Sequence, residues 1–258
     1  MSVPIVREAE AVVKPKEVKI PVRAVPRVEI PEKVVQRHAL RLETKRVNGI
    51  ALTMVSYDRR DYGLKVADQA SPGVRWDTAR EAAGNANALA AINGGFFTPE
   101  GKPLGMLVAS GKKEGSVNRA SFLGSGFFVG GMDRLMSRDA YLKSPPASKE
   151  LLQSGPRLLW DGSIPKGLSG DSSRPRSFLL WDGKHHFAIA YADSASLSGL
   201  ARTLKGQPFS HFRIKSALNL DGGRSSDLWV SSSVKGGPVT RRSWINKSVR
   251  NYLVLHRN

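Results

Sequence analysis

A local pattern that occurs twice limits the fold of this chain more than any other part of its sequence. In each copy, a short apolar run ends in a polar residue and two glycines, first over 90–95 (Ala-Ala-Ile-Asn-Gly-Gly) and again over 217–223 (Ala-Leu-Asn-Leu-Asp-Gly-Gly). Helix-start signals precede both runs, with capping-box spacing at 78–81 and a capping serine at 196 or 198. We therefore predict two similar helix-strand-Gly-Gly halves whose strand ends converge on one site.

Much of the remaining chain is typical of β-structure. Asn48-Gly49 separates two alternating segments and predicts a type I′ hairpin over 38–57, and Asp182-Gly183 predicts a second hairpin over 178–191. Shorter apolar runs predict further strands within 105–111, 121–130, 158–160, 228–234 and 252–255. The predicted fold class is α+β, with β-rich mixed sheets and a few flanking helices.

The chain divides by composition into a tail and one domain. Residues 1–36 are rich in Pro, Val, Lys and Glu, contain no glycine, and carry prolines too closely spaced for a helix. We expect this segment to be extended or disordered, although 22–30 alternates well enough to add an edge strand. Residues 37–258 are long enough to bury a core as a single domain.

Composition narrows the class of protein. The chain has no cysteine, which excludes a disulfide scaffold, and no apolar run approaches the ~20 residues that span a bilayer. A formal net charge of +18 favours polyanionic partners such as phosphate-rich polymers, anionic glycans, acidic lipids or nucleic acid. The basic residues are spread along the chain and no nucleic-acid-binding motif is evident, so specific nucleic-acid recognition is disfavoured.

Four motifs in order give the sequence a family resemblance. They are Asn-Gly-Gly-Phe-Phe at 93–97, Ser-Gly-Pro-Arg-Leu at 154–158, Leu-Asp-Gly-Gly followed by Ser-Ser within 220–226, and Arg-Asn-Tyr-Leu at 250–253. From about Val47 to the C-terminus the chain resembles the phosphodiester glycosidase family. One departure is Arg224, which stands where that family usually has a third glycine.

The resemblance implies a hydrolase that cleaves the glycosidic bond of a sugar-1-phosphodiester, with a cell-surface or exopolysaccharide glycan as substrate. It also implies export to the periplasm or cell exterior, although Met1-Ser2-Val3-Pro4 lack the basic start of a signal peptide. Arg224 and the net charge motivate an alternative, a non-catalytic binding module for anionic glycans. We expect no cofactor and no metal ligand set, and the oligomeric state is left open.

Cleavage of such a bond requires a carboxylate near the sugar ring, because positive charge develops at the anomeric carbon. Asp221, at the end of a predicted strand, is the candidate, and its alternative role is to cap the Gly-Gly turn. Asp193 is the candidate for a second carboxylate, with helix-cap or turn residue as an equally plausible role.

The phosphate requires cationic donors. We predict Arg157 and Arg176 for this role because an arginine fork can hold two phosphate oxygens, with Arg224 as a third and a solvated surface position as the alternative for each. Arg176-Ser177 also resembles the Arg-Thr pair of the family. The remaining predicted substrate-binding residues supply amide, hydroxyl or backbone N–H donors and a side-chain-free approach: Asn93, Gly94, Gly95, Gly222, Gly223 and Ser225.

Overall fold

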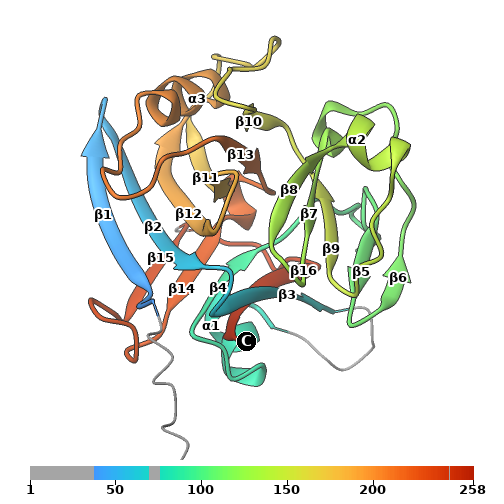
Figure 1. The fold of residues 1–258 in the computed structure, drawn as a ribbon, viewed down its shortest axis with the longest axis horizontal. Coiled ribbons are helices and arrows are strands. Elements are labelled where there is room, and N and C mark those ends of the chain that lie inside the picture. Colours follow the sequence, from blue (N-terminus) through green and yellow to red (C-terminus); the bar gives the residue numbers. More distant parts are fainter. Residues whose placement is uncertain (1–37, 70–75, 244) are drawn as a thin grey trace, which may run out of the picture. The chain divides into compact units, whose positions relative to one another are not determined.

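A computed structural model describes residues 38–69, 76–243 and 245–258, which form three antiparallel sheets with short helices beside them (Figure 1). The N-terminal segment 1–36, including the expected edge strand, lies outside the described residues. None of the helices in these ranges is long and apolar enough to cross a membrane.

Every strand in the three sheets pairs antiparallel, where mixed sheets were expected. The first sheet has the order β1 (Arg41–Val47), β2 (Ile50–Asp58), β12 (His186–Ala195), β11 (Arg174–Trp181), β13 (Ser216–Asn219) and β10 (Arg157–Leu159). The second has the order β15 (Val239–Arg242), β14 (Asp227–Val230), β4 (Ala90–Asn93), β16 (Asn251–Arg257) and β3 (Tyr62–Asp68). The third has the order β6 (Lys112–Glu114), β5 (Leu107–Ala109), β9 (Leu151–Ser154), β7 (Gly126–Val129) and β8 (Arg134–Ser137).

The largest hydrophobic core is shared by all three sheets. Ile189 of β12, Ile92 of β4 and Phe128 of β7 belong to the same buried cluster. Each sheet also packs a helix against another face: α3 (Leu197–Lys205) covers the first, α1 (Ala79–Asn85) the second and α2 (Arg138–Lys143) the third. The layers therefore meet through apolar faces that the alternating strand patterns supply.

The local signals in the sequence are confirmed where they were strongest. Asn48 and Gly49 both have positive φ between β1 and β2, as a type I′ turn requires. The Thr78 side chain caps α1 by accepting the Glu81 N–H, and Ser196 caps α3 through the Gly199 N–H. The α+β class with few helices is thus correct.

Candidate functional site

The two Gly-Gly motifs meet in space although their strands belong to different sheets. The Asp221 N–H donates to the Gly94 carbonyl at 3.0 Å, and the Asn93 side-chain amide donates to the Asp221 carbonyl at 2.8 Å. The ends of β4 and β13 are therefore bonded directly to each other. This confirms the predicted convergence of the two helix-strand-Gly-Gly halves.

The Asp221 carboxylate lies half-buried at this junction. Its Oδ1 accepts the Gly222 N–H at 2.9 Å. Burial raises the pKa of Asp221 above its ordinary value, while the Ser225 hydroxyl, the Gly222 N–H and the charge of Lys247 act in the opposite direction. The result is a carboxylate that is held in place, poorly hydrated and still partly open to solvent.

Arg176 is fixed beside Gly222, the residue after Asp221, at the irregular end of β11. The pairing of β11 with β12 shifts register between Arg174 and Arg176, a feature that redirects side chains near functional sites. The guanidinium donates to the Ala195 carbonyl at 3.0 Å and the Ser172 carbonyl at 3.3 Å. Its Nη1 lies 3.4 Å from where a Cβ on Gly222 would be, so the guanidinium lies against the Asp221 loop.

Arg157 occupies a similar position on β10. The pairing of β10 with β13 shifts register just after Arg157, which pairs with Leu218. The guanidinium carbon lies 5.2 Å from the centre of the Trp160 ring, a cation-π contact that fixes its direction. The third predicted cation, Arg224, has an exposed side chain, and its carbonyl accepts the Lys247 N–H at 3.0 Å.

The junction is stabilised by Asn93, Gly94 and Gly95. Their donors form hydrogen bonds within the protein and are not free to bind a ligand. The Asn93 amide is fully buried, and its Oδ1 accepts the Asp227 N–H at 3.0 Å. The Gly94 N–H donates to the Asn251 carbonyl at 2.8 Å and the Gly95 N–H to the Asn251 Oδ1 at 2.9 Å. The expectation that these N–H groups face phosphate is therefore corrected, because Asn251 of β16 already occupies both.

These hydrogen bonds predict a specific cost for a methyl group at Gly94. A Cβ there would overlap the Asn251 Oδ1, so Gly94→Ala is expected to lower the free energy of unfolding by about 2–4 kcal/mol. Gly84→Ala is the matched control, since a Cβ on this α1 residue meets nothing within 4 Å and should stabilise by about 1 kcal/mol. Urea unfolding of both variants measures the contrast. Equal effects would show that Asn251 does not hold the junction.

Asp193 is placed elsewhere by its own contacts. Its Oδ1 accepts the Ala51 N–H at 2.9 Å, and its Oδ2 lies 3.6 Å from Arg46. These partners are on the β1–β2 hairpin, and 44% of the Asp193 side chain is exposed. The structure therefore ties this carboxylate to the edge of the first sheet and not to the Asp221 loop.

A model of the phosphodiester glycosidase family matches residues 86–256, a span that contains Asn93, Arg157, Arg176 and Asp221. The chain belongs to the phosphodiester glycosidase family. A comparison with curated protein sequences gives no match.

Three solved structures resemble the fold of this phosphodiester glycosidase family member at low sequence identity. The zebrafish N-acetylglucosamine-1-phosphodiester alpha-N-acetylglucosaminidase catalytic domain, auto-inhibited by its pro-peptide, aligns with a TM-score of 0.59 and 19% identity over 85% of this chain and 82% of that one. A hypothetical protein from Synechocystis gives 0.57 and 15% over 85% and 62% of the two chains. A Burkholderia pseudomallei K96243 protein described as exported gives 0.50 and 13% over 80% and 74%.

Several buried polar groups surround the junction of the two Gly-Gly motifs. The sequence did not indicate a role for them. Asn219 donates to the Gly155 carbonyl at 3.0 Å, and Asp227 accepts the Ala79 N–H at 2.9 Å. Within the described ranges, the following buried atoms have no hydrogen-bond partner: Ser154 Oγ, Arg157 Nε, Ser177 Oγ, Asn219 Oδ1, Ser226 Oγ, Asp227 Oδ1 and Asn251 Nδ2. Native folds rarely leave such groups unpaired.

Proposed function

We propose that this chain hydrolyses the glycosidic bond of a sugar-1-phosphodiester, with Asp221 as the catalytic carboxylate. The observation that carries the proposal is that the loop with the desolvated Asp221 carboxylate also contacts the anchored guanidinium of Arg176, at Gly222. The reaction requires a carboxylate near the sugar ring and a cation near the phosphate, and residues of both kinds border this loop. Gly222 and Gly223 serve this role by leaving the loop without side chains.

The chemistry follows from how charge develops in the reaction. As the bond between the anomeric carbon and phosphate oxygen breaks, positive charge grows on the ring and negative charge on the phosphate. Asp221 stabilises the ring carbon as nucleophile or electrostatic partner, and Arg157 and Arg176 hold the phosphate oxygens. Because phosphate is a good leaving group, the reaction needs no strong general acid, and Asp193 can remain a structural residue of the β1–β2 hairpin.

The substrate class is proposed from the relatives. The zebrafish structure is that of an enzyme named for N-acetylglucosamine-1-phosphodiester, which makes this sugar the first probe. The resemblance to a protein described as exported supports an exported enzyme that acts on a cell-surface or exopolysaccharide glycan. The net charge of +18 would draw such an anionic polymer to the protein.

The experiment is release of free sugar from a panel of sugar-1-phosphodiesters that includes N-acetylglucosamine. We expect turnover of at least one member, with sugar and phosphomonoester as products. Binding of the panel without turnover would support the alternative of a non-catalytic module for anionic glycans, in which Arg224 supplies a cation in place of a glycine. If the protein neither binds nor hydrolyses any member of the panel, both functions are refuted.

Arg176 provides a further test of phosphate recognition. Arg176→Gln removes one preorganised donor group and is expected to reduce kcat/KM by about 10²-fold. Arg174→Gln is the matched control, since it removes the same charge from an exposed neighbour and should have a small, salt-sensitive effect. Equal losses in the two variants would mean that net charge, and not the anchored fork, recognises the phosphate. Circular dichroism checks the fold of both.

A further inference from the structure

A second group of charged residues lies at the other end of the first sheet. Strand register places Arg176 opposite Ala192, near Asp221, whereas His186 at the start of β12 pairs with Asp58 at the end of β2. A cavity of about 580 Å³ opens at this far end. We call it the histidine pocket, and its lining residues are His38, Ala39, Leu40, Arg41, Leu42, Ser56, Tyr57, Asp58, His186, His211 and Lys235.

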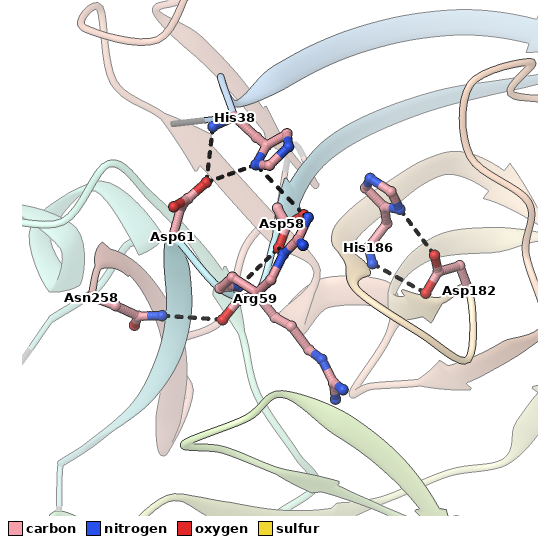
Figure 2. A network of polar contacts seen from close by, with 8 residues as sticks. His38, Asp58, Arg59, Asp61, Asp182, His186 and Asn258 are labelled. Atoms are coloured by element: carbon pink, nitrogen blue, oxygen red, sulfur yellow. Dashed lines mark hydrogen bonds and ion pairs between the residues drawn. The ribbon is translucent and has the colours of Figure 1, made fainter. Parts of the chain in front are cut away.

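Each histidine of the pocket is held by a carboxylate through the same ring nitrogen. The three Nδ1–carboxylate pairs are His38 with Asp61, His186 with Asp182 and His211 with Glu43, each at 3.0 Å. Such a bond fixes the ring and leaves Nε2 as the nitrogen that can meet a ligand. Figure 2 shows the second nitrogens of His38 and His186 on the sides of the two rings that face one another. The Nε2 of His211 lies 3.3 Å from the Ser56 hydroxyl.

Two permanent cations complete the pocket. Arg41 and Lys235 line it with exposed side chains, and neither forms an ion pair with another residue of the described ranges. The buried Asp58 is compensated by Arg60 at 2.6 Å, whose hydrogen bonds lower the pKa of Asp58 to about 2. The acidic groups at the pocket are therefore already engaged, and the positive charge of Arg41 and Lys235 is open to a ligand.

Protonation of the histidines would add positive charge to the same space. The groups that face them are Arg41 and Glu43 from β1, Asp58, Arg60 and Asp61 from the β2–β3 turn, Asp182 from the β11–β12 hairpin, and Lys235. Burial is the main cause that lowers the pKa of His211; Arg41 and His186 lower it further, and Glu43 acts in the opposite direction. The nearby positive charges thus add to the cost of charging this ring. An anion seated between them would remove that repulsion.

We propose that the histidine pocket is a binding site for a sugar-sized ligand that carries a phosphate or carboxylate group, and that it binds more tightly in acid. The volume matches small-molecule sites of roughly 300–1,000 Å³ and exceeds what a bare phosphate fills. Leu40 and Leu42 supply an apolar wall for the body of the ligand, while Arg41, Lys235 and the Nε2 groups of His38 and His186 bind its charge. The site is separate from Asp221 and does not depend on the proposed hydrolysis.

The first experiment follows the histidine ring signals by NMR during titration with glucose 1-phosphate, glucuronate and neutral N-acetylglucosamine. At pH 5.5 we expect His38, His186 and His211 to shift with one or both anions, while His256, outside the pocket, stays fixed. Affinity should fall about tenfold or more by pH 7.5, because loss of protons from the imidazoles removes positive charge from the pocket. Comparing the two anions distinguishes phosphate from carboxylate. Shifts with the neutral sugar of equal size, or none with either anion, would overturn the proposal.

The second experiment removes the fixed cations. Arg41→Gln combined with Lys235→Gln is expected to weaken binding at pH 5.5 by about tenfold or more. The pair Lys113→Gln and Lys149→Gln, exposed positions outside the pocket, is the control with the same loss of charge. Measuring both in an Asp221→Asn background keeps the result separate from hydrolysis. Undiminished binding in the pocket variant, or an equal loss in the control, would rule the site out.

Discussion

Asp221→Asn is expected to lower kcat for sugar-1-phosphodiester hydrolysis by about 10²- to 10⁴-fold, the usual contribution of a positioned catalytic group. The asparagine keeps the shape of the side chain and its Oδ1 can still accept the Gly222 N–H, so the loop should retain its conformation. The loss should therefore appear in kcat, with the fold and the affinity for phosphate preserved. Steady-state kinetics on the best member of the panel measure the effect.

Although Asp221→Asn is expected to lower activity, it should raise the free energy of unfolding at neutral pH. Burial raises the pKa of Asp221, so the folded state disfavours its charge. When a carboxyl has a higher pKa in the folded state than in the unfolded state, its contribution to stability is fully present at a pH below the unfolded-state pKa. That contribution is lost as the pH rises through the folded-state pKa. At neutral pH the asparagine variant should thus be more stable than the wild type, and the difference should vanish in acid. Loss of activity with gain of stability is typical of a functional residue.

Asp193→Asn is the matched control, because it removes a carboxylate from the same end of the first sheet. Its ion pair with Arg46 is partly exposed, so the free energy of unfolding should change by less than about 1 kcal/mol. We expect kcat to stay near the wild-type value. If Asp193→Asn reduces kcat as strongly as Asp221→Asn, the reaction uses two carboxylates and the structural role assigned to Asp193 is wrong.

Local signals predicted much of the fold. The Asn48-Gly49 turn, the Thr78 and Ser196 caps and the two Gly-Gly loops depend on residues that are neighbours in sequence, so the chain reveals them directly. Strand β3 (Tyr62–Asp68) was missed, although Tyr62, Leu64 and Val66 alternate with less apolar residues in the sequence, a signal that could have identified it. The strands β8 and β9 have only four residues each, too few for a clear period.

The contacts of the site depend on distant partners, which the sequence does not place. Gly94 and Gly95 resemble a ligand loop, yet Asn251, on the neighbouring strand β16 and distant in sequence, accepts both of their N–H groups. The family resemblance at 250–253 was the available signal for that residue. Arg157 and Arg176, predicted to bind phosphate, lie beside β13 and the Asp221 loop, and the register shifts at their positions arise from strand pairing.

The histidines show the same limit. His38, His186 and His211 have no motif spacing in the sequence. The antiparallel order β1-β2-β12 brings the first two to one end of the sheet, and the chain after α3 adds the third. Topology therefore creates a site from residues whose local sequence carries no signal.

Asp133 gives the largest expected effect on stability. This buried residue precedes β8 of the third sheet, and its Oδ2 accepts the Tyr57 hydroxyl of β2 at 2.5 Å and the Leu64 N–H of β3 at 2.8 Å. It thus joins the three sheets through one oxygen atom. Its Oδ1 is buried without a hydrogen-bond partner in the described part of the chain. Burial dominates these bonds and raises the pKa of Asp133 to about 7.

The sign of the resulting pH dependence follows from proton binding. An unfolded aspartate loses its proton near pH 3.9, whereas folded Asp133 keeps it to about pH 7. Between these values the folded state binds more protons than the unfolded chain, so the free energy of unfolding contributed by this group falls as pH rises. A shift of about three units at ~1.4 kcal/mol per unit makes the total loss roughly 4 kcal/mol. Wild-type protein should therefore weaken from mild acid to pH 8.

Asp133→Asn removes this titration while preserving the acceptor for Tyr57 and Leu64. In urea unfolding from pH 4.5 to pH 8, the free energy of unfolding of the variant should increase relative to that of the wild type by several kcal/mol. Most of this change should be complete near pH 7. Asp139→Asn, an exposed carboxyl in the first turn of α2, is the control and should follow the wild-type curve. Parallel curves for wild type and Asp133→Asn would mean that Asp133 is ionised throughout this range. Its bond to the Tyr57 hydroxyl would then join the sheets as a charged contact.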